Sequence, residues 1–219
     1  MGGRRRPGAH RPAARLFAHD RALGAPRIAG ADEAGRGCLA GPLVVSAVCL
    51  DLGSLTGAGR RALGDLDDSK RLRPDVRARV ADAVMRHAEQ VVVLCASPAT
   101  IDRDGLHRTN LRLLARALAA LRPCPDVCLV DGFRLGDPAP EHRRVIGGDH
   151  LSASIAAASV IAKTVRDRLM AGPVAEAYPG FGFASHVGYA TLDHRNALQA
   201  EGLTPLHRRS FQSMAYPDP

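Results

Sequence analysis

The feature that most constrains this fold is the short interval between two apolar runs near the start of the chain. RIAGAD begins at Arg27 and PLVVSAVCL begins at Pro42, and both are typical of β-strands. The nine residues between them, 33–41, are too few for the helix that a parallel crossover connection requires. The two runs therefore predict an antiparallel hairpin at the start of the fold.

The later segments alternate between helical and strand-like patterns. Apolar residues recur at helical spacing after Pro74 and across 105–121, and the small residues of 152–170 predict a long, closely packed helix. VVVLCAS reads as a buried strand, DVCLVDG as another, and RRVIGG as a further short one. The order predicts an α/β fold with a mixed sheet, in which an antiparallel hairpin leads into parallel strands flanked by helices. A helical C-terminal segment follows.

The positive charge of the chain is concentrated at its N-terminal end. The net charge is +8, and residues 1–27 carry seven arginines and one aspartate, which is +6 of that total. We predict a basic, disordered arm over 1–27, followed by a single catalytic domain over 28–219. The arm either adds non-specific affinity for nucleic acid or has no specific role.

Neither a membrane span nor a secretory signal is predicted. No apolar run approaches the ~18–20 residues that cross a bilayer, and no apolar stretch follows the N-terminal arginines. These observations predict a cytoplasmic protein with no membrane partner. Nothing in the sequence demands more than a monomer.

The glycine-rich loop after the first strand has two possible interpretations. Gly35, Gly37 and Ala40 match a relaxed dinucleotide fingerprint, GxGxxG/A. That fingerprint must open a helix, whereas this loop runs into Pro42 and a strand. The neighbouring Asp32 and Glu33 would also repel phosphates, so a nucleotide-dependent dehydrogenase is disfavoured.

A metal site uses the same acidic pair. Asp32 and Glu33 are adjacent carboxylates that can face one site only where the strand breaks into a loop, and hard oxygen ligands suit Mg²⁺ or Mn²⁺. Asp131 ends an apolar strand, where α/β sheets bind ligands. Asp149 precedes the long helix, where helix capping is the alternative role. Four carboxylates around two cations would make a two-metal phosphodiesterase.

Eight motifs, in chain order, resemble those of bacterial ribonuclease HII. They are DEAGRG, GPLV, DSKRL, VDG, GGD, AAASVIAKTVRDRLM, HVGY and HRRSF, and the resemblance covers about residues 28–211. It implies an RNase H-like fold and a metal-dependent endonuclease that cleaves the RNA strand of RNA–DNA hybrids. It also implies cleavage 5′ of single ribonucleotides embedded in duplex DNA, leaving 3′-hydroxyl and 5′-phosphate ends. Mn²⁺ or Mg²⁺ would be the cofactor and DNA repair the role.

The resemblance also implies roles for individual residues. Four would bind the metals and carry the catalysis: Asp32, Glu33, Asp131 and Asp149. Seven would contact the substrate: Gly35, Arg36 and Gly37 at the 2′-hydroxyl and scissile backbone, Ser69 and Lys70 at phosphates, Tyr189 stacked at the RNA–DNA junction, and Lys163. For Lys163, the alternative role is that of a structural partner for a carboxylate.

Three positions depart from the family pattern. Gly147 and Val187 stand where lysine is usual, and Phe181 stands where tyrosine is frequent. Because the four carboxylates are intact, we expect retained chemistry with altered substrate affinity, for which the basic arm could compensate. Two related alternatives are ribonuclease HIII, which carries a larger N-terminal domain, and a catalytically silent hybrid-binding module, which unneutralised carboxylates disfavour.

Overall fold

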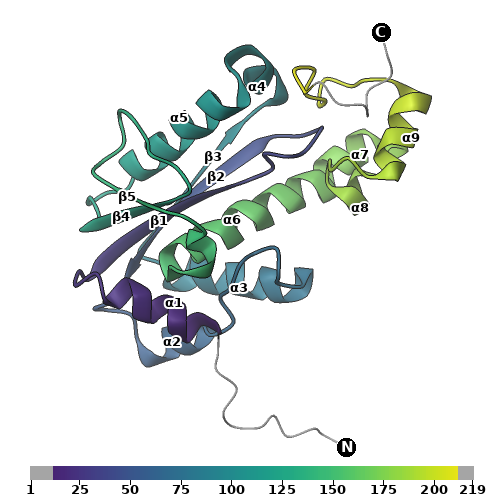
Figure 1. The fold of residues 1–219 in the computed structure, drawn as a ribbon. Helices are drawn as coiled ribbons and strands as arrows, with labels where there is room; N and C mark the ends of the chain where they lie inside the picture. The colour runs from purple at the N-terminus through teal and green to yellow at the C-terminus, as the bar shows by residue number, and fades with distance from the viewer. Residues whose placement is uncertain (1–11, 212–219) are drawn as a thin grey trace, which may run out of the picture.

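The computed structural model of this protein describes residues 12–211 and centres on a five-stranded mixed sheet (Figure 1). The strand order is β3-β2-β1-β4-β5. β1 and β2 pair antiparallel from Arg27–Asp51 to Ala34–Val44, which confirms the predicted hairpin. β3 pairs antiparallel with β2, whereas β4 runs parallel to β1 and β5 parallel to β4. The strands are β1 Arg27–Ala34, β2 Leu43–Asp51, β3 Gln90–Ala96, β4 Val127–Asp131 and β5 Arg143–Val145.

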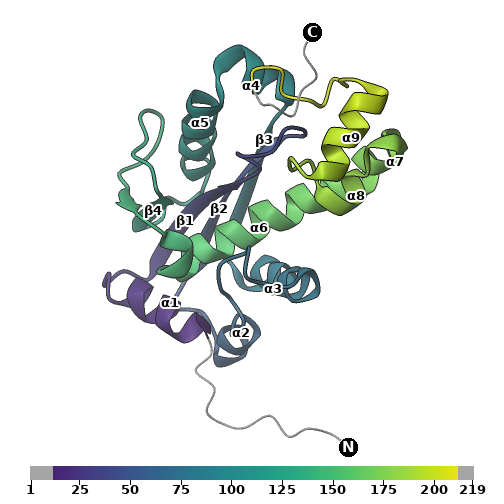
Figure 2. The ribbon, with the colours of Figure 1, turned by 45° about the vertical axis from the view of Figure 1, so that its right-hand side comes forward.

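Helices cover both faces of this sheet (Figure 2). The residues of each strand alternate between the two faces, so Ala29 and Ala31 pack on the side of α5, whereas Ile28 packs on the side of α6. α1 and α3 lie on the α6 side and complete its apolar core. The longer helices are α1 Pro12–Arg21, α3 Pro74–His87, α5 Leu106–Ala119, α6 Ala153–Leu169 and α9 Leu192–Glu201; shorter ones are α2 Gly57–Ala62, α4 Pro98–Asp104, α7 Ala175–Ala177 and α8 Phe183–His186.

The long helix α6 crosses β1 in close contact at Gly30. A Cβ atom on this glycine would overlap the backbone of Ser154 and Ile155. Ser152 caps the helix by accepting a hydrogen bond from the Ile155 N–H at 3.3 Å. The small residues predicted to allow close packing therefore fix the first turn of α6 against the middle of β1.

Two features differ from the sequence-based expectation. β3 is an edge strand, so it is only partly buried and Cys95 is exposed. α1 lies inside the stretch predicted as a disordered arm, and Ala13, Leu16 and Phe17 are buried in the core. The first eleven residues of that arm lie outside the described residues. The division into an arm and one domain stays a prediction. Within residues 12–211, no helix is both long enough and apolar enough to span a bilayer.

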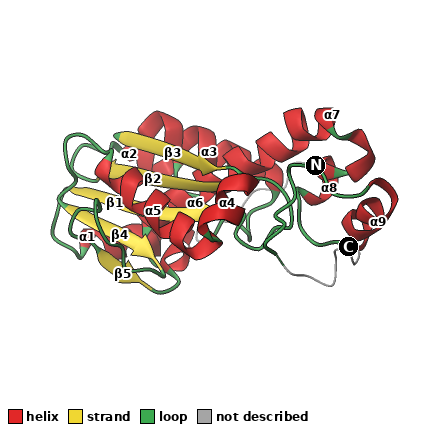
Figure 3. Cartoon of the chain, turned by 90° about the horizontal axis from the view of Figure 1, so that it is seen from above, coloured by secondary structure: helices red, strands yellow, loops and turns green. Residues whose placement is uncertain are grey.

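The predicted helical C-terminal segment forms a small lobe beyond one end of the sheet (Figure 3). After α6 the chain kinks at Gly172 and Pro173, where the backbone leaves helical geometry, and it then continues into α7, α8 and α9. Phe181, Phe183 and Leu198 form its core together with Leu39 and Ala40 from the loop between β1 and β2. This lobe therefore holds the glycine-rich loop from one side.

Three buried histidines lie together in this lobe, and two of them form a hydrogen-bonded chain. The Thr204 N–H donates to His207 Nδ1 at 3.0 Å, so His207 carries its proton on Nε2 and donates to His194 Nε2 at 3.1 Å. His194 Nδ1 then donates to the Tyr189 carbonyl at 2.9 Å. His186 accepts from the Gly188 N–H and stacks on His194, with ring centroids 4.4 Å apart. His194 and His207 each accept a hydrogen bond at one ring nitrogen, so both of these rings are neutral in this arrangement.

Candidate metal and nucleic-acid site

Three of the four predicted carboxylates converge where β1 and β4 separate. The parallel pairing of these strands ends at Ala31 and Val130, so Asp32 and Asp131 are the next residue on each strand. Asp149 comes from the 3₁₀ turn Gly148–His150, just ahead of α6. One oxygen from each aspartate lies within 4.8 Å of the others. Helix capping was the alternative role for Asp149, but the observed N-cap of α6 is Ser152.

Glu33 lies on the opposite face of the strand from these three. β1 continues through Ala34, so the strand does not break at the acidic pair as expected, and its side chains keep alternating. Asp32 is on the α6 face and Glu33 is on the α5 face. The Glu33 carboxylate lies 3.5 Å from the Arg36 guanidinium, and its Oε2 atom is buried with no hydrogen-bond partner.

Burial and neighbouring carboxylates raise the pKa values of Asp32, Glu33 and Asp149. Burial raises the pKa of Asp32 well above its ordinary value, and the charges of Glu33 and Asp131 raise it further. Burial and the charges of Asp131 and Asp68 raise the pKa of Asp149. The pKa of Glu33 is also raised, mainly by burial. A divalent cation would stabilise the charged forms, and this all-oxygen donor set fits Mg²⁺ or Mn²⁺.

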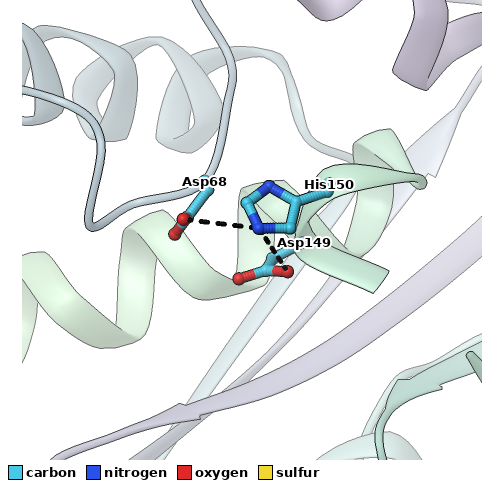
Figure 4. A group of neighbouring side chains, drawn as sticks. All are labelled: Asp68, Asp149 and His150. Carbon is cyan, nitrogen blue, oxygen red and sulfur yellow. Dashed lines mark ion pairs between the residues drawn. The ribbon is translucent and has the colours of Figure 1, made fainter. Parts of the chain in front are cut away.

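A second group shares Asp149 and was not predicted from the sequence. The Nε2 atom of His150 lies 3.7 Å from an Asp68 oxygen and 3.9 Å from an Asp149 oxygen (Figure 4). One ligand atom from each of these residues lies within 4.8 Å of the others. Asp68 directly precedes the predicted site residue Ser69, and His150 directly follows Asp149. These positions in the sequence were the only indication that Asp68 and His150 could belong to the site.

Ser69 and Lys70 occupy different environments although they are neighbours. Ser69 is buried and its Oγ lies 2.9 Å from Ser159 Oγ on α6. Ser159 in turn bonds the Asp32 carboxylate and acts to lower its pKa. Lys70 is exposed; burial alone would lower its pKa, but the carboxylates, Asp149 first, raise it overall. Lys70 therefore faces the acidic site, whereas Ser69 supports it from the core.

The glycine-rich loop is shaped by a close approach at Gly35. This residue has φ +93°, and a Cβ atom there would overlap the Arg166 guanidinium. The space beside Gly37 is open, with nothing within 4 Å of a Cβ built there. Arg36 lies over the Phe133 ring, 4.8 Å from its centroid. The loop thus presents Gly37 and the Arg36 side chain next to the acidic site.

Two fully buried arginines hold this loop through its carbonyl groups. Arg166 donates to the carbonyls of Ala40 and Pro42 and to that of Val187, at 2.9–3.0 Å. Arg208 donates to Gly41 and Arg36 carbonyls at 2.9–3.1 Å. Neither residue was predicted as a site residue from the sequence, although Arg166 lies in the motif AAASVIAKTVRDRLM and Arg208 in HRRSF.

Tyr189 and Lys163 lie together at the edge of the C-terminal lobe. The Lys163 ammonium lies 5.0 Å from the Tyr189 ring centroid and 2.9 Å from an Asp167 oxygen. Tyr189 is 39% exposed. Lys163 therefore has the carboxylate partner that its alternative role required, while the tyrosine ring remains accessible.

Comparisons with known proteins match most of this chain. The family model described as Ribonuclease HII matches residues 29–214. A Ribonuclease HII of Mycobacterium avium is 47% identical over 84% of this chain and 77% of its own length. One from Thiobacillus denitrificans is 46% identical over 86% of this chain and 89% of its own. The crystal structure of ribonuclease H2 from Pyrococcus horikoshii has a TM-score of 0.72 at 26% identity, covering 85% of this chain and 94% of that one.

The region that these comparisons match takes in the sheet and the C-terminal lobe. The mixed sheet and its flanking helices match a solved member of the same group, and the family model spans every predicted site residue. The identities with the two bacterial relatives are well above the level at which a shared family is doubtful. The chain therefore belongs to the ribonuclease HII family, whose members are RNase H endonucleases that cleave the RNA strand of RNA–DNA hybrids.

Proposed function

We propose that this protein cleaves both RNA–DNA hybrids and duplex DNA that contains single ribonucleotides, by two-metal hydrolysis. The cut falls on the 5′ side of the ribonucleotide and leaves 3′-hydroxyl and 5′-phosphate ends. The observation that supports this most directly is the convergence of Asp32, Asp131 and Asp149 at the end of the sheet. The role that follows is removal of ribonucleotides from DNA by a cytoplasmic, monomeric enzyme.

The acidic residues have one task, to hold Mn²⁺ or Mg²⁺. Asp32, Asp131 and Asp149 would bind the cations, and Glu33 would complete the set from the other face of β1. When bound, the cations supply the Lewis acidity that hydrolysis of a phosphodiester requires. Because the same cations neutralise the carboxylates, they also allow a polyanionic substrate to approach.

The residues around the acidic site would bind the substrate. Open space beside Gly37 allows a ribose to approach the main chain, where the 2′-hydroxyl distinguishes RNA from DNA. Arg36 and Lys70 would contact phosphates. The accessible Tyr189 ring would stack on a base or sugar at the RNA–DNA junction. Ser69 and Lys163, which have partners within the protein, would act by holding Asp32 and Tyr189 in place.

A nicking assay tests this proposal. A labelled duplex with one embedded ribonucleotide is incubated with Mn²⁺, Mg²⁺ or a chelator, next to an all-DNA duplex and a long hybrid. We expect metal-dependent nicks 5′ of the ribonucleotide and no cleavage of the all-DNA duplex. Asp32→Asn should abolish cleavage while retaining the fold. Binding without cleavage by the wild-type protein would instead support a silent hybrid-binding module.

A further inference from the structure

The side of the sheet that α5 covers contains a buried polar side chain that the proposed function has not used. Asn110, on α5, is 0% exposed, and neither its amide nitrogen nor its amide oxygen makes a hydrogen bond of ordinary geometry with the described residues. Burying an amide without a partner costs free energy, so an apolar residue of similar size would be more favourable for folding alone. The position of this amide therefore needs a reason beyond stability.

The group that Asn110 faces is Glu33, which is on the same face of β1. The Asn110 side chain lies within loose hydrogen-bonding reach of the Glu33 carboxyl, and this contact acts against the rise that burial causes in the pKa of Glu33. No hydrogen bond of ordinary geometry joins the two, and the Glu33 Oε2 atom is also buried without a partner. The other oxygen of Glu33 lies 3.5 Å from Arg36. A potential donor and an unsatisfied acceptor thus lie next to each other beside the acidic site.

We propose that Asn110 is a positioning residue for Glu33. When the cation site is filled, the Asn110 amide N–H donates to the buried Oε2 atom of Glu33. No other described donor bonds this atom, so the contact fixes the orientation of the Glu33 carboxylate. Groups that orient metal-binding carboxylates in this way affect metal affinity, although they touch neither metal nor substrate. The proposal rests on the metal site of the proposed function and names a residue that supports it.

The decisive variant is Asn110→Leu, which is close in size and removes both unpartnered atoms. Without metal, its melting temperature should equal or exceed that of the wild type, because a buried polar group has been removed. Its affinity for Mn²⁺, measured by titration calorimetry, should fall by about tenfold or more. Cleavage should fall at limiting Mn²⁺ and recover at excess Mn²⁺, which a folding defect would not allow.

Thr109→Val is the matched control. Thr109 precedes Asn110 on α5, is equally buried and has an unpartnered hydroxyl, but it projects about 100° away around the helix. Its loss should leave Mn²⁺ affinity unchanged. If Asn110→Leu does not fold, Asn110→Ala serves the same test below its own melting temperature, because a cavity lowers stability without supplying a donor.

The outcomes separate this inference from the function on which it rests. Wild-type affinity for Mn²⁺ in Asn110→Leu or Asn110→Ala would overturn the role of Asn110, as would an equal loss in Thr109→Val. The metal site itself would still be supported if the wild type binds Mn²⁺ and Asp32→Asn does not. Failure of the wild type to bind Mn²⁺ would overturn the proposed function itself.

Discussion

The main-chain N–H of Gly148 donates a hydrogen bond of 2.7 Å to the Oδ1 atom of Asp131. This bond joins the turn that carries Asp149 to the end of β4, so two of the converging carboxylates are placed relative to each other by one short contact. Gly148 is required there because a Cβ atom would overlap the Ile155 side chain and lie 3.3 Å from Asp131 Oδ1.

Gly148→Ala should therefore disturb both the fold and the site. We expect a loss of about 1–3 kcal/mol in the free energy of unfolding, typical of overpacking, together with weaker Mn²⁺ binding. Denaturant unfolding and calorimetric titration measure the two effects. Gly136→Ala is the control, since nothing lies within 4 Å of a Cβ built at that loop position. Equal behaviour of the two variants would contradict this explanation.

Arg166→Lys should destabilise the protein strongly although it preserves the charge. The guanidinium donates to three carbonyls from two segments, and one ammonium group cannot reach all of them. Each carbonyl left unpaired and buried costs about 1–3 kcal/mol, and at least one would be, so we expect a loss of about 1–3 kcal/mol or more in denaturant unfolding. Arg168→Lys, an exposed residue 3.8 Å from Asp82, should change stability by no more than about 0.5 kcal/mol.

Acid should destabilise the C-terminal lobe through its neutral histidines. Burial lowers the pKa of His207 to about 4 and also lowers the pKa of His194 from 6.5. As the pH falls, these histidines take up protons at a higher pH in the unfolded chain than in the folded protein. The folded state therefore has its full stability above about pH 6.5 and loses stability as the pH falls toward 4. The slope is at most about 1.4 kcal/mol per pH unit for each histidine.

Denaturant unfolding between pH 7.5 and pH 5 measures this loss. His207→Gln should flatten the pH dependence, because one of the groups that must stay neutral has been removed. His107→Gln alters an exposed histidine on α5 and should leave the slope as it is in the wild type. Parallel pH profiles for the wild type and His207→Gln would refute the assignment.

Val187→Lys should strengthen substrate binding. Val187 has φ +44°, an unfavourable conformation for a β-branched residue, and it stands two residues before the accessible Tyr189. A lysine there removes the β-branch and adds a phosphate contact. We expect a lower KM for hybrid substrate and a slope of log affinity against log salt that steepens by about one. An unchanged salt slope would show that position 187 does not face the substrate backbone.

Removal of residues 1–11 tests the basic arm without disturbing α1. This segment carries four arginines and lies outside the described residues, whereas α1 contributes Leu16 and Phe17 to the core. We expect weaker hybrid binding at low salt, a shallower salt dependence and unchanged thermal stability. Replacement of the four arginines by glutamine should reproduce the effect. Equal hybrid affinity of the full chain and the truncated variant at low salt would show that residues 1–11 do not contribute to binding.

The sequence determined the elements of the fold and much of the site. The interval of nine residues fixed the β1–β2 hairpin, and helical spacing located α3 and α5, because these signals are local. The acidic residues could be selected because paired carboxylates at strand ends need a cation. The family motifs then connected Asp131 and Asp149 to the pair, although they lie about a hundred residues further along the chain.

Only the tertiary structure decided how these residues face one another. Strand alternation through Ala34 sends Asp32 to the α6 face and Glu33 to the α5 face, a separation that depends on where the strand ends. Ser69 proved buried against Ser159, and Lys163 paired with Asp167. Asn110 carries no sequence signal of its own, and the motifs that contain Arg166 and Arg208 do not show what these arginines contact, because burial and hydrogen-bond partners arise only when distant segments pack together.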